Sequence, residues 1–402
     1  MKKLLYVICA ILSLCMLFSV VGCNSTDTPA TDDPTDAPTD KPTEKPTEAP
    51  TDKPTEKPTE KPTEKPTEKP SRPIVSATYS LFDDWNLFKI CGRVQYVKDG
   101  IVCDFTASGI EFSGMMKGDV DIELDCDRDT YFTVFVDGER VEERLFADKN
   151  TEFLTIANLG DEPAEHNIRF LKQTEPQQSL TLLKGVTVTG YLDDYPPEDR
   201  DYYIEFVGDS LTAAYGNIGK PGASNPGSAL WQDGTQSYAF LACEELGADY
   251  SIAACSGVGI DKGWTAFSVL DFYKKESFYR DLNNTHYDPR TPDIIVINLG
   301  TNDYDCGSSE NGFKTKAKAL IEYLRDSYGE DVTIVWAYNF GGYGCDSWAF
   351  DVIEELGGEE NGIYTFRMTY NNEGANGHPD LEAHYVAADE LVSFIKDKKL
   401  LD

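Results

Sequence analysis

The chain has 402 residues, a formal net charge of -34, ten cysteines and four histidines. This length allows two folded domains once processed and low-complexity segments are set aside. Residues 74–402 contain 58 acidic and 26 basic residues, hence -32, so the acidity belongs to the folded part of the chain. Such a surface repels nucleic acid and anionic polymers, and we expect no nucleic-acid partner. It does not oppose a neutral ligand.

The N-terminus has the features of a secretory signal. Two lysines precede an apolar run over residues 4–21 that ends in a small residue and a cysteine. The sequence Val20-Val21-Gly22-Cys23 resembles the lipobox of bacterial lipoproteins, which implies a signal peptide over residues 1–22 and lipidation of Cys23. The alternative is a plain N-terminal membrane helix, because the run is about long enough to span a bilayer. We favour an extracellular, cell-surface lipoprotein that touches the membrane through its lipid alone.

Residues 23–73 form a low-complexity tract. From Pro42 to Pro70 the sequence repeats Pro-Thr-Glu-Lys with few departures. A proline at every fourth residue excludes helix and sheet, so we expect a disordered, extended linker. At ~3.1 Å per residue, some 45 residues of this kind would reach roughly 140 Å. Such a spacer would carry a catalytic domain away from a membrane.

The cysteines indicate neither a disulfide framework nor a metal site. Seven stay after Cys23 and the two in the signal are set aside, and no Cys-x-x-Cys pair occurs. No cluster of histidine, cysteine and carboxylate has the spacing of metal ligands, so we expect no metal and no other cofactor.

Residues 74–195 have the pattern of an all-β domain. Apolar and polar residues alternate in short runs, and Val136-Asp137-Gly138-Glu139 is typical of a hairpin. No helical period of useful length occurs. Many short strands with polar turns between them predict a β-sandwich. The alternating runs lie at residues 110–113, 120–124, 131–136, 153–156, 167–170 and 186–189.

Residues 196–402 alternate between predicted strands and predicted helices. An acidic joint with two prolines, residues 193–199, separates this part from the β-sandwich. The almost continuous apolar run at 293–299 is typical of a buried parallel strand. The alternation predicts an α/β fold, a parallel sheet with helices on both faces. Strands are expected at 202–207, 250–254, 293–299 and 332–338, and helices at 238–246, 313–328 and 387–399.

Four loops of this second domain carry polar groups that suit acyl transfer. Gly208-Asp209-Ser210 follows the first strand, Gly257 the second and Asn302 the third, while His378 precedes the last helix. The carboxyl ends of parallel strands meet at one edge of a sheet, so these groups can converge. Ser210 is the predicted nucleophile and His378 its general base, with an unperturbed pKa near ~6.5.

Negative charge that develops on a carbonyl oxygen during acyl transfer needs preorganised donors. The predicted oxyanion hole consists of the backbone amides of Ser210 and Gly257 and the side chain of Asn302. Losing one such donor costs roughly 3–4 kcal/mol of transition-state stabilisation.

The other histidines are weaker candidates for the base. His166 lies in the β-sandwich, and His286 precedes a strand start, so it should lie at the far end of the sheet. His384 lies at the start of the last helix, where we favour a supporting structural role over catalysis.

The four loops, in this order, resemble the SGNH (GDSL-type) hydrolase family over residues 201–402. Gly208-Asp209-Ser210-Leu211 matches the family's first block, Gly257 its second, Gly300-Thr301-Asn302-Asp303 its third and the His378 loop its fifth. Gly-Asp-Ser alone is a weak signal, whereas all four blocks in order after predicted strands are specific. The resemblance implies the three-layer parallel sheet of that family.

The loop of His378 departs from the family's pattern. The family usually places an aspartate three residues before its histidine, where this chain has Ala375, and neither Glu373 nor Asp380 has the usual spacing. In this the chain resembles carbohydrate esterase family two, in which a Ser-His dyad can suffice, a main-chain carbonyl orients the histidine, and a jelly-roll-like β-sandwich comes first. We therefore expect a backbone carbonyl near Asn376 to accept the Nδ1 proton of His378.

That resemblance implies an esterase of the acetyl xylan type, which removes O-acetyl groups from plant polysaccharides such as xylan or mannan through an acetyl-enzyme. Its partner would be the acetylated polysaccharide or oligosaccharide, and we expect a monomer. Aromatic faces usually hold sugar rings, and Trp264, Tyr304 and Trp336 are the candidates. A core position is the favoured alternative for Trp336.

Two other functions stay open. One is a lipase or broad-specificity esterase of the same fold, although no long apolar lid segment is present. The other is a non-catalytic carbohydrate-binding surface protein, against which Ser210, Asn302 and His378 are all intact.

Overall fold

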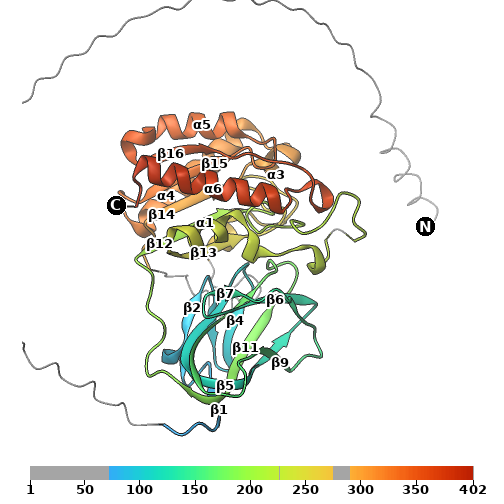
Figure 1. Cartoon of the computed structure of the whole chain (residues 1–402). Coiled ribbons are helices and arrows are strands. Elements are labelled where there is room, and N and C mark those ends of the chain that lie inside the picture. Colours follow the sequence, from blue (N-terminus) through green and yellow to red (C-terminus); the bar gives the residue numbers. More distant parts are fainter. Residues whose placement is uncertain (1–71, 226, 275–289, 402) are drawn as a thin grey trace, which may run out of the picture. The chain divides into compact units, whose positions relative to one another are not determined.

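The computed structural model describes residues 72–225, 227–274 and 290–401, which belong to one compact unit (Figure 1). The predicted signal peptide, the lipidation of Cys23, almost all of the predicted linker and His286 lie outside the described residues. In the described ranges no helix is both long enough and apolar enough to cross a membrane.

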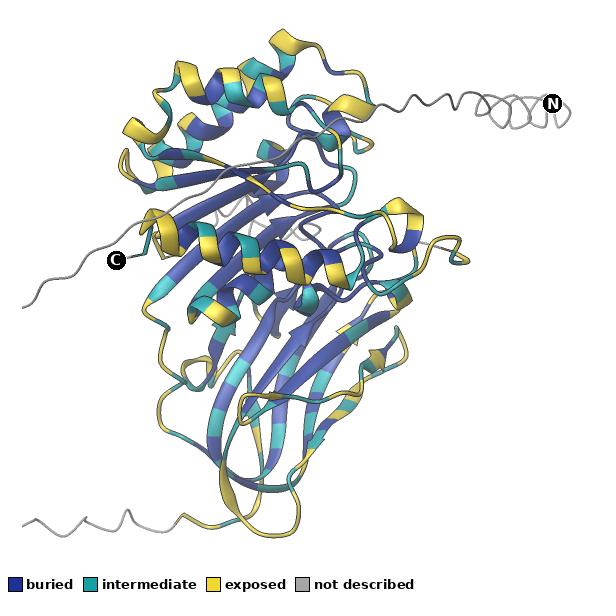
Figure 2. Cartoon of the chain, turned by 45° about the horizontal axis from the view of Figure 1, so that its top comes forward, coloured by how far each residue is buried: buried dark blue, intermediate teal, exposed yellow. Residues whose placement is uncertain are grey.

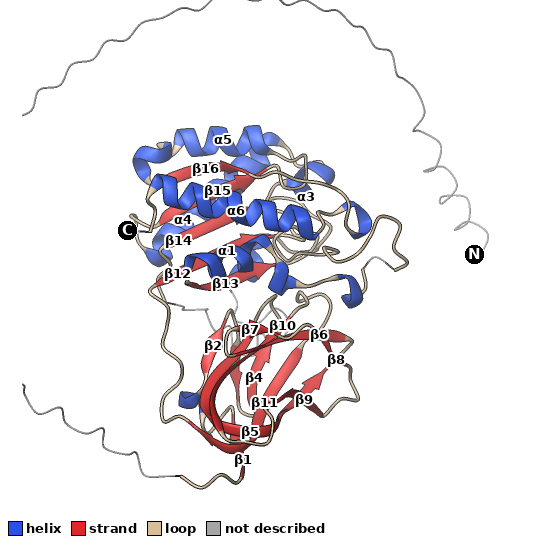
Figure 3. Ribbon diagram, in the orientation of Figure 1, coloured by secondary structure: helices blue, strands red, loops and turns tan. Residues whose placement is uncertain are grey.

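Antiparallel strands build residues 76–192, called the β-domain here (Figure 3). The longest strand, β5 (Gly109–Cys126), contains both runs expected at 110–113 and 120–124. Its first half pairs with β10 (Ala164–Lys172) and its second half with β11 (Thr181–Leu192). The other strands are β1 (Ser76–Ser80), β2 (Lys89–Cys91), β3 (Gln95–Val97), β4 (Gly100–Cys103), β6 (Thr130–Val136), β7 (Glu139–Arg140), β8 (Leu145–Ala147) and β9 (Phe153–Asn158).

Residues 202–398 form the α/β domain, whose five strands are all parallel. Their order is β13-β12-β14-β15-β16, so the chain runs from β12 outward to β13 and then returns past β12 to β14. The switch point therefore lies between β12 and β14. Ligand sites in such sheets lie beyond the carboxyl ends of the strands at this switch point, which is where β12 ends and Ser210 follows. The strands are β12 (Tyr202–Gly208), β13 (Ala248–Ala254), β14 (Ile294–Asn298), β15 (Thr333–Tyr338) and β16 (Ile363–Arg367).

Helices cover both faces of this sheet, each with an apolar side turned inward (Figure 2). On one face lie α1 (Tyr238–Leu246) and α6 (Leu381–Lys398), and on the other α2 (Val269–Tyr273), α4 (Glu310–Tyr328) and α5 (Asp346–Glu355). The predicted fold class, an all-β domain followed by a parallel sheet between helices, is confirmed. Helix α6 begins six residues before the predicted start, because the Asp380 side chain caps it by accepting from the Ala383 N–H at 3.1 Å.

A buried ion pair joins the β-domain to β12 of the α/β sheet. The Arg93 guanidinium lies 2.5 Å from the Glu205 carboxylate, and neither side chain is exposed. The hydroxyls of Tyr273 and Tyr328 also donate to Glu205, at 2.8 and 3.0 Å. Because an unpaired buried charge is costly, β12 depends on the β-domain for its neutralisation.

We expect Arg93→Met to lower the free energy of unfolding by roughly 3–5 kcal/mol, because it leaves the Glu205 charge buried without its cation. Arg93→Met combined with Glu205→Gln should recover a large part of the loss. Urea unfolding followed by circular dichroism measures both. As a control, Lys318→Met breaks an exposed ion pair with Glu355 and should change stability by less than about 1 kcal/mol. Equal losses in the single and double variants would contradict the role of the buried charge.

Candidate active site

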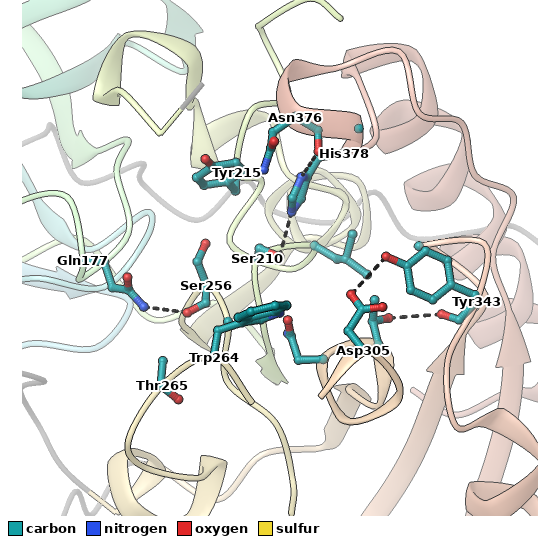
Figure 4. Close-up of a pocket in the computed structure, with 16 residues that line it drawn as sticks. Gln177, Ser210, Tyr215, Ser256, Trp264, Thr265, Asp305, Tyr343, Asn376 and His378 are labelled. Atoms are coloured by element: carbon teal, nitrogen blue, oxygen red, sulfur yellow. Dashed lines mark hydrogen bonds between the residues drawn. The ribbon is translucent and has the colours of Figure 1, made fainter. Parts of the chain in front are cut away.

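Ser210 and His378 lie side by side at the carboxyl end of the sheet. The Oγ of Ser210 is 2.9 Å from the Nε2 of His378 (Figure 4). Ser210 follows β12 in a tight turn, in which Ala213 donates its backbone N–H to the Asp209 carbonyl at 3.0 Å. This hydrogen-bonded turn fixes the hydroxyl within reach of the imidazole, the geometry that general-base activation of a serine requires.

A backbone carbonyl orients the imidazole of His378. Asn376 has a φ of 56°, a left-handed conformation that asparagine tolerates, and its carbonyl oxygen lies 3.3 Å from Nδ1. A carbonyl can only accept, so Nδ1 carries the proton and Nε2 is left to accept from Ser210. In the described part of the chain no carboxylate is hydrogen-bonded to Nδ1, and burial lowers the pKa of His378 below its usual 6.5.

Tyr215 packs against this imidazole, a contact that no sequence pattern predicted. The two ring centroids are 4.6 Å apart. Tyr215 belongs to the turn that begins at the nucleophile, since its backbone N–H donates to the Ser210 carbonyl at 2.9 Å. The ring lines the same cavity as Ser210 and limits the directions in which the imidazole can turn.

The three predicted oxyanion donors all line one cavity of about 520 Å³. Among the described residues, the backbone N–H groups of Ser210 and Gly257 have no hydrogen-bond partner. The amide nitrogen of Asn302 differs, because it donates to Asp209 Oδ2 at 3.0 Å and to the Val258 carbonyl at 2.9 Å. A substrate oxygen would therefore compete for Asn302, whereas the two backbone donors are free.

Asp209 holds both Asn302 and the turn after the nucleophile. Its Oδ1 accepts the Leu211 N–H at 2.9 Å, while Oδ2 accepts from Asn302. The carboxyl is fully buried, and this burial, helped by the charge of nearby Asp303, raises the pKa of Asp209 to about 7. Asp209 therefore titrates close to neutral pH.

The predicted aromatic contacts divide into three cases. Trp264 is 74% exposed and lines the cavity, where its ring lies between Ser256 and Asp305 (Figure 4). Tyr304 is exposed outside the cavity lining, with its ring 5.8 Å from that of Tyr343, which does line it.

The prediction that Trp336 contacts the substrate is wrong. Its side chain has no exposure, because it points from β15 into the core beneath α4, where its ring packs against Phe313 at 6.3 Å. The apolar run that marked β15 as a buried strand already favoured this core position.

His384 has a structural role. Its Nδ1 accepts the Tyr238 backbone N–H at 3.1 Å and so ties α6 to the start of α1. Full burial lowers the pKa of His384 to about 3, so the ring is neutral. His166 lies in the β-domain beside Asp137. Within the described ranges, no three His, Cys, Asp or Glu side chains are placed to hold a metal ion.

Both halves of the described chain match known families. Residues 204–386 match the family described as GDSL-like Lipase/Acylhydrolase, and residues 90–196 match Carbohydrate esterase 2 N-terminal. The chain combines a carbohydrate esterase 2 N-terminal domain with a GDSL-like acylhydrolase domain. Residues 26–72 match the PT disordered repeat family. The carbohydrate esterase 2 match covers most of the β-domain.

Two curated proteins and one solved structure illustrate the relationship. Cellulase/esterase CelE of Acetivibrio thermocellus is 24% identical over 316 residues, which are 75% of this chain and 38% of that protein. Acetylxylan esterase / glucomannan deacetylase of Cellvibrio japonicus is 30% identical over 171 residues, which are 40% of this chain and 46% of that protein. The chain thus spans less than half the length of either relative.

A family two carbohydrate esterase from Clostridium thermocellum, solved in complex with cellohexaose, has the same fold. The TM-score is 0.71 at 24% identity, and the match covers 78% of this chain and 99% of the solved one. The match extends through both domains, because the two together make up this share of the chain.

Ser210 should react covalently with a fluorophosphonate, and the rate should rise with pH through the pKa of His378, whose neutral form is the base. Because burial lowers that pKa, the half-maximal rate should lie below pH ~6.5. Mass spectrometry of the adduct across pH 4–9 measures the profile, and Ser210→Ala should not label. Asp209→Asn tests the neighbouring carboxyl. A midpoint above pH ~7 that Asp209→Asn does not move would contradict this assignment to His378.

Proposed function

We propose that this chain is an extracellular carbohydrate esterase that removes O-acetyl groups from plant polysaccharides such as xylan and mannan. The observation that carries the proposal is the 2.9 Å contact between Ser210 and His378, beside two backbone N–H groups that have no partner within the described ranges. A nucleophile, its base and unpaired N–H groups in one cavity suit acyl transfer. The name of the Cellvibrio japonicus relative, acetylxylan esterase / glucomannan deacetylase, points to the same substrate class.

The reaction follows from the roles of the side chains. Nε2 of His378 takes the proton as Ser210 Oγ attacks the acetyl carbonyl, and the N–H groups of Ser210 and Gly257 stabilise the resulting oxyanion. The tetrahedral intermediate collapses when His378 returns the proton to the departing sugar oxygen, which leaves acetyl on Ser210. Water, activated by the same imidazole, then releases acetate and restores the serine.

A Ser-His dyad is the catalytic unit of this proposal. The Asn376 carbonyl fixes the Nδ1 tautomer, which is one of the two tasks that a carboxylate performs in a triad. A neutral carbonyl stabilises the imidazolium less than a carboxylate would, in keeping with the lowered pKa of His378.

The charges around the cavity favour a neutral polysaccharide. Asp305 is the one carboxylate in the described lining, and no lysine or arginine lies there. Residues 74–402 together carry a charge of -32. An acidic polymer would meet repulsion at the cavity and on approach, whereas acetylated xylan or glucomannan backbones would not.

The proposal includes the cell surface as the working location. The lipobox-like residues 20–23 and the repeat that follows them support a lipoprotein tethered through Cys23. The proposal takes it to act as a monomer. An external substrate too large to enter a cell makes this placement consistent with the chemistry.

Acetate release from acetylated xylan and acetylated glucomannan tests the function. We expect wild type to release acetate and Ser210→Ala to fall by roughly 10⁴-fold or more, since it removes the nucleophile. Ser347→Ala, an exposed serine on α5, is the matched control and should retain wild-type activity. Acetylated pectin should be a poorer substrate because of its carboxylates.

Two results would favour the other functions. Release only from long-chain esters would favour a lipase or broad-specificity esterase. Polysaccharide binding without acetate release by wild type would favour a non-catalytic binding protein.

Trp264→Ala should weaken hydrolysis of the polymer more than hydrolysis of 4-nitrophenyl acetate. The exposed indole offers a flat face to sugar rings next to the scissile bond, and a small aryl ester does not use it. We expect kcat/KM on acetylated xylan to fall roughly tenfold, the size of a ~1.4 kcal/mol contact. Trp85→Ala removes a comparably exposed tryptophan, 57% accessible, from the β-domain and should change neither substrate. Equal losses on both substrates would contradict a platform role.

A further inference from the structure

The β-domain sends one segment into the catalytic cavity. Residues 173–180 connect β10 to β11, and the Gln177 side chain from this segment lines the cavity together with Ser210 and His378. In Figure 4 Gln177 reaches toward Ser256, the residue that precedes the oxyanion donor Gly257. The segment therefore contacts the loop after β13 that carries Ser256 and Gly257, called the oxyanion loop here.

Glu175 of this segment accepts hydrogen bonds from both donors of Ser256, its backbone N–H and its hydroxyl. Its Oε2 accepts the Ser256 backbone N–H and its Oε1 accepts the Ser256 hydroxyl, each at 2.6 Å. Glu175 has no exposure, so its carboxylate is shielded from bulk water. Burial raises the pKa of Glu175, while the two bonds from Ser256 oppose that change.

Gln177 holds the next group along the chain. Its Nε2 donates to the Ser256 carbonyl at 2.5 Å. This carbonyl shares one planar peptide with the N–H of Gly257, and in a trans peptide the two groups point in opposite directions. Holding the carbonyl on the β-domain side therefore turns the Gly257 N–H to the other side, where it has no partner among the described residues.

The far side of the loop and the segment itself are also fixed. The Gly257 carbonyl accepts the Trp264 backbone N–H at 2.8 Å, and Gly257 has a φ of 77°, which favours glycine. Behind Glu175, the buried Lys172 ammonium donates to the Thr174 carbonyl at 2.6 Å. The donor is thus supported by two successive sets of polar contacts, those of Ser256 with Glu175 and Gln177 and those of Lys172 behind them.

We propose that Glu175 and Gln177 are positioning residues of the esterase, through which the β-domain sets the direction of the Gly257 N–H toward the oxyanion. The inference rests on the proposed acyl-transfer function. It assigns the β-domain a part in catalysis that does not require it to bind sugar.

Such a role affects kcat more than KM. Oxyanion donors act on charge that develops only in the transition state, so a misdirected N–H slows the chemical step and leaves binding of the ester almost unchanged. We expect Glu175→Ala to lower kcat on 4-nitrophenyl acetate roughly 10- to 100-fold, somewhat less than loss of a whole donor, with KM changed less than about twofold.

Glu175→Gln is the informative partner of this variant. Its amide oxygen can still accept the Ser256 N–H, and its NH₂ group can donate to the Ser256 hydroxyl, so both contacts persist without the charge. It should retain kcat within about threefold of wild type, since the hydrogen bonds carry the positioning. Gln177→Leu, nearly equal in size, should lower kcat in the same direction as Glu175→Ala.

Glu244→Gln is the matched control. This carboxylate of α1 also crosses the domain boundary, binding Arg169 of β10 at 2.8 Å, and it lies outside the cavity lining. It should lower the thermal midpoint without lowering kcat. If Glu175→Ala fails to fold, Gln177→Leu and Ser256→Ala carry the same kcat test, because each leaves the bond between Glu175 and the Ser256 N–H in place.

Two outcomes overturn the inference in different ways. Wild-type kcat in folded Glu175→Ala and Gln177→Leu would overturn the positioning role and leave the esterase function standing. Absence of hydrolysis by wild type on every ester would overturn the proposed function, and this inference with it. A loss of kcat confined to the alanine and leucine variants, with rescue in Glu175→Gln, supports it.

Discussion

The buried contact between Arg93 and Glu205 is the constraint on which the arrangement of the two domains depends. Glu205 lies in the middle of β12, the strand that leads directly to Ser210, and its charge cannot be solvated there. Arg93, the cation that neutralises it, belongs to the β-domain. A carboxylate buried without a cation is strongly destabilising, so the α/β sheet cannot keep this strand intact alone. The β-domain is therefore structurally part of the catalytic domain rather than a detachable binding module.

The same boundary carries other polar contacts, in each of which the side chain from the β-domain is buried. Glu175 binds Ser256, and Arg169 binds Glu244 on α1. Buried polar groups with fixed partners define one relative position of two surfaces, because a shifted position would leave each group unsatisfied. An apolar boundary would tolerate small sliding far better. The polar boundary therefore gives the oxyanion loop a fixed reference on its β-domain side.

Much of the fold and the chemical centre could be predicted from local sequence. Apolar runs at 202–207 and 293–299 mark buried parallel strands, and the rule that loops meet at their carboxyl ends was enough to bring Ser210 and His378 together. Ala375, which replaces an expected aspartate, was enough to predict a carbonyl partner for Nδ1, and the structure places the Asn376 carbonyl there. These features follow from short-range pattern and from the geometry of one sheet.

The contacts that cross between domains could not be predicted in the same way. Glu205 interrupts an apolar run, but nothing nearby in sequence identifies Arg93, 112 residues earlier, as its partner. Glu175 and Gln177 sit in a polar stretch that is typical of a surface loop. The prediction that Trp336 contacts the substrate was wrong because it relied on side-chain type alone. Its aromatic ring suggested a surface for sugar binding, whereas strand periodicity placed it in the core. The type of a side chain indicates which interactions it can make, whereas the packing of the whole chain determines where in the fold it makes them.

The engagement of Asn302 bears on how the oxyanion hole works. Both hydrogens of its amide are taken, by Asp209 and by the Val258 carbonyl, whereas the Gly257 N–H is unpaired among the described residues. Burial raises the pKa of Asp209 to about 7, so below that pH its carboxyl becomes neutral and attracts the amide less strongly. The backbone donor at Gly257 has no such dependence, and it is the donor that the β-domain holds in place.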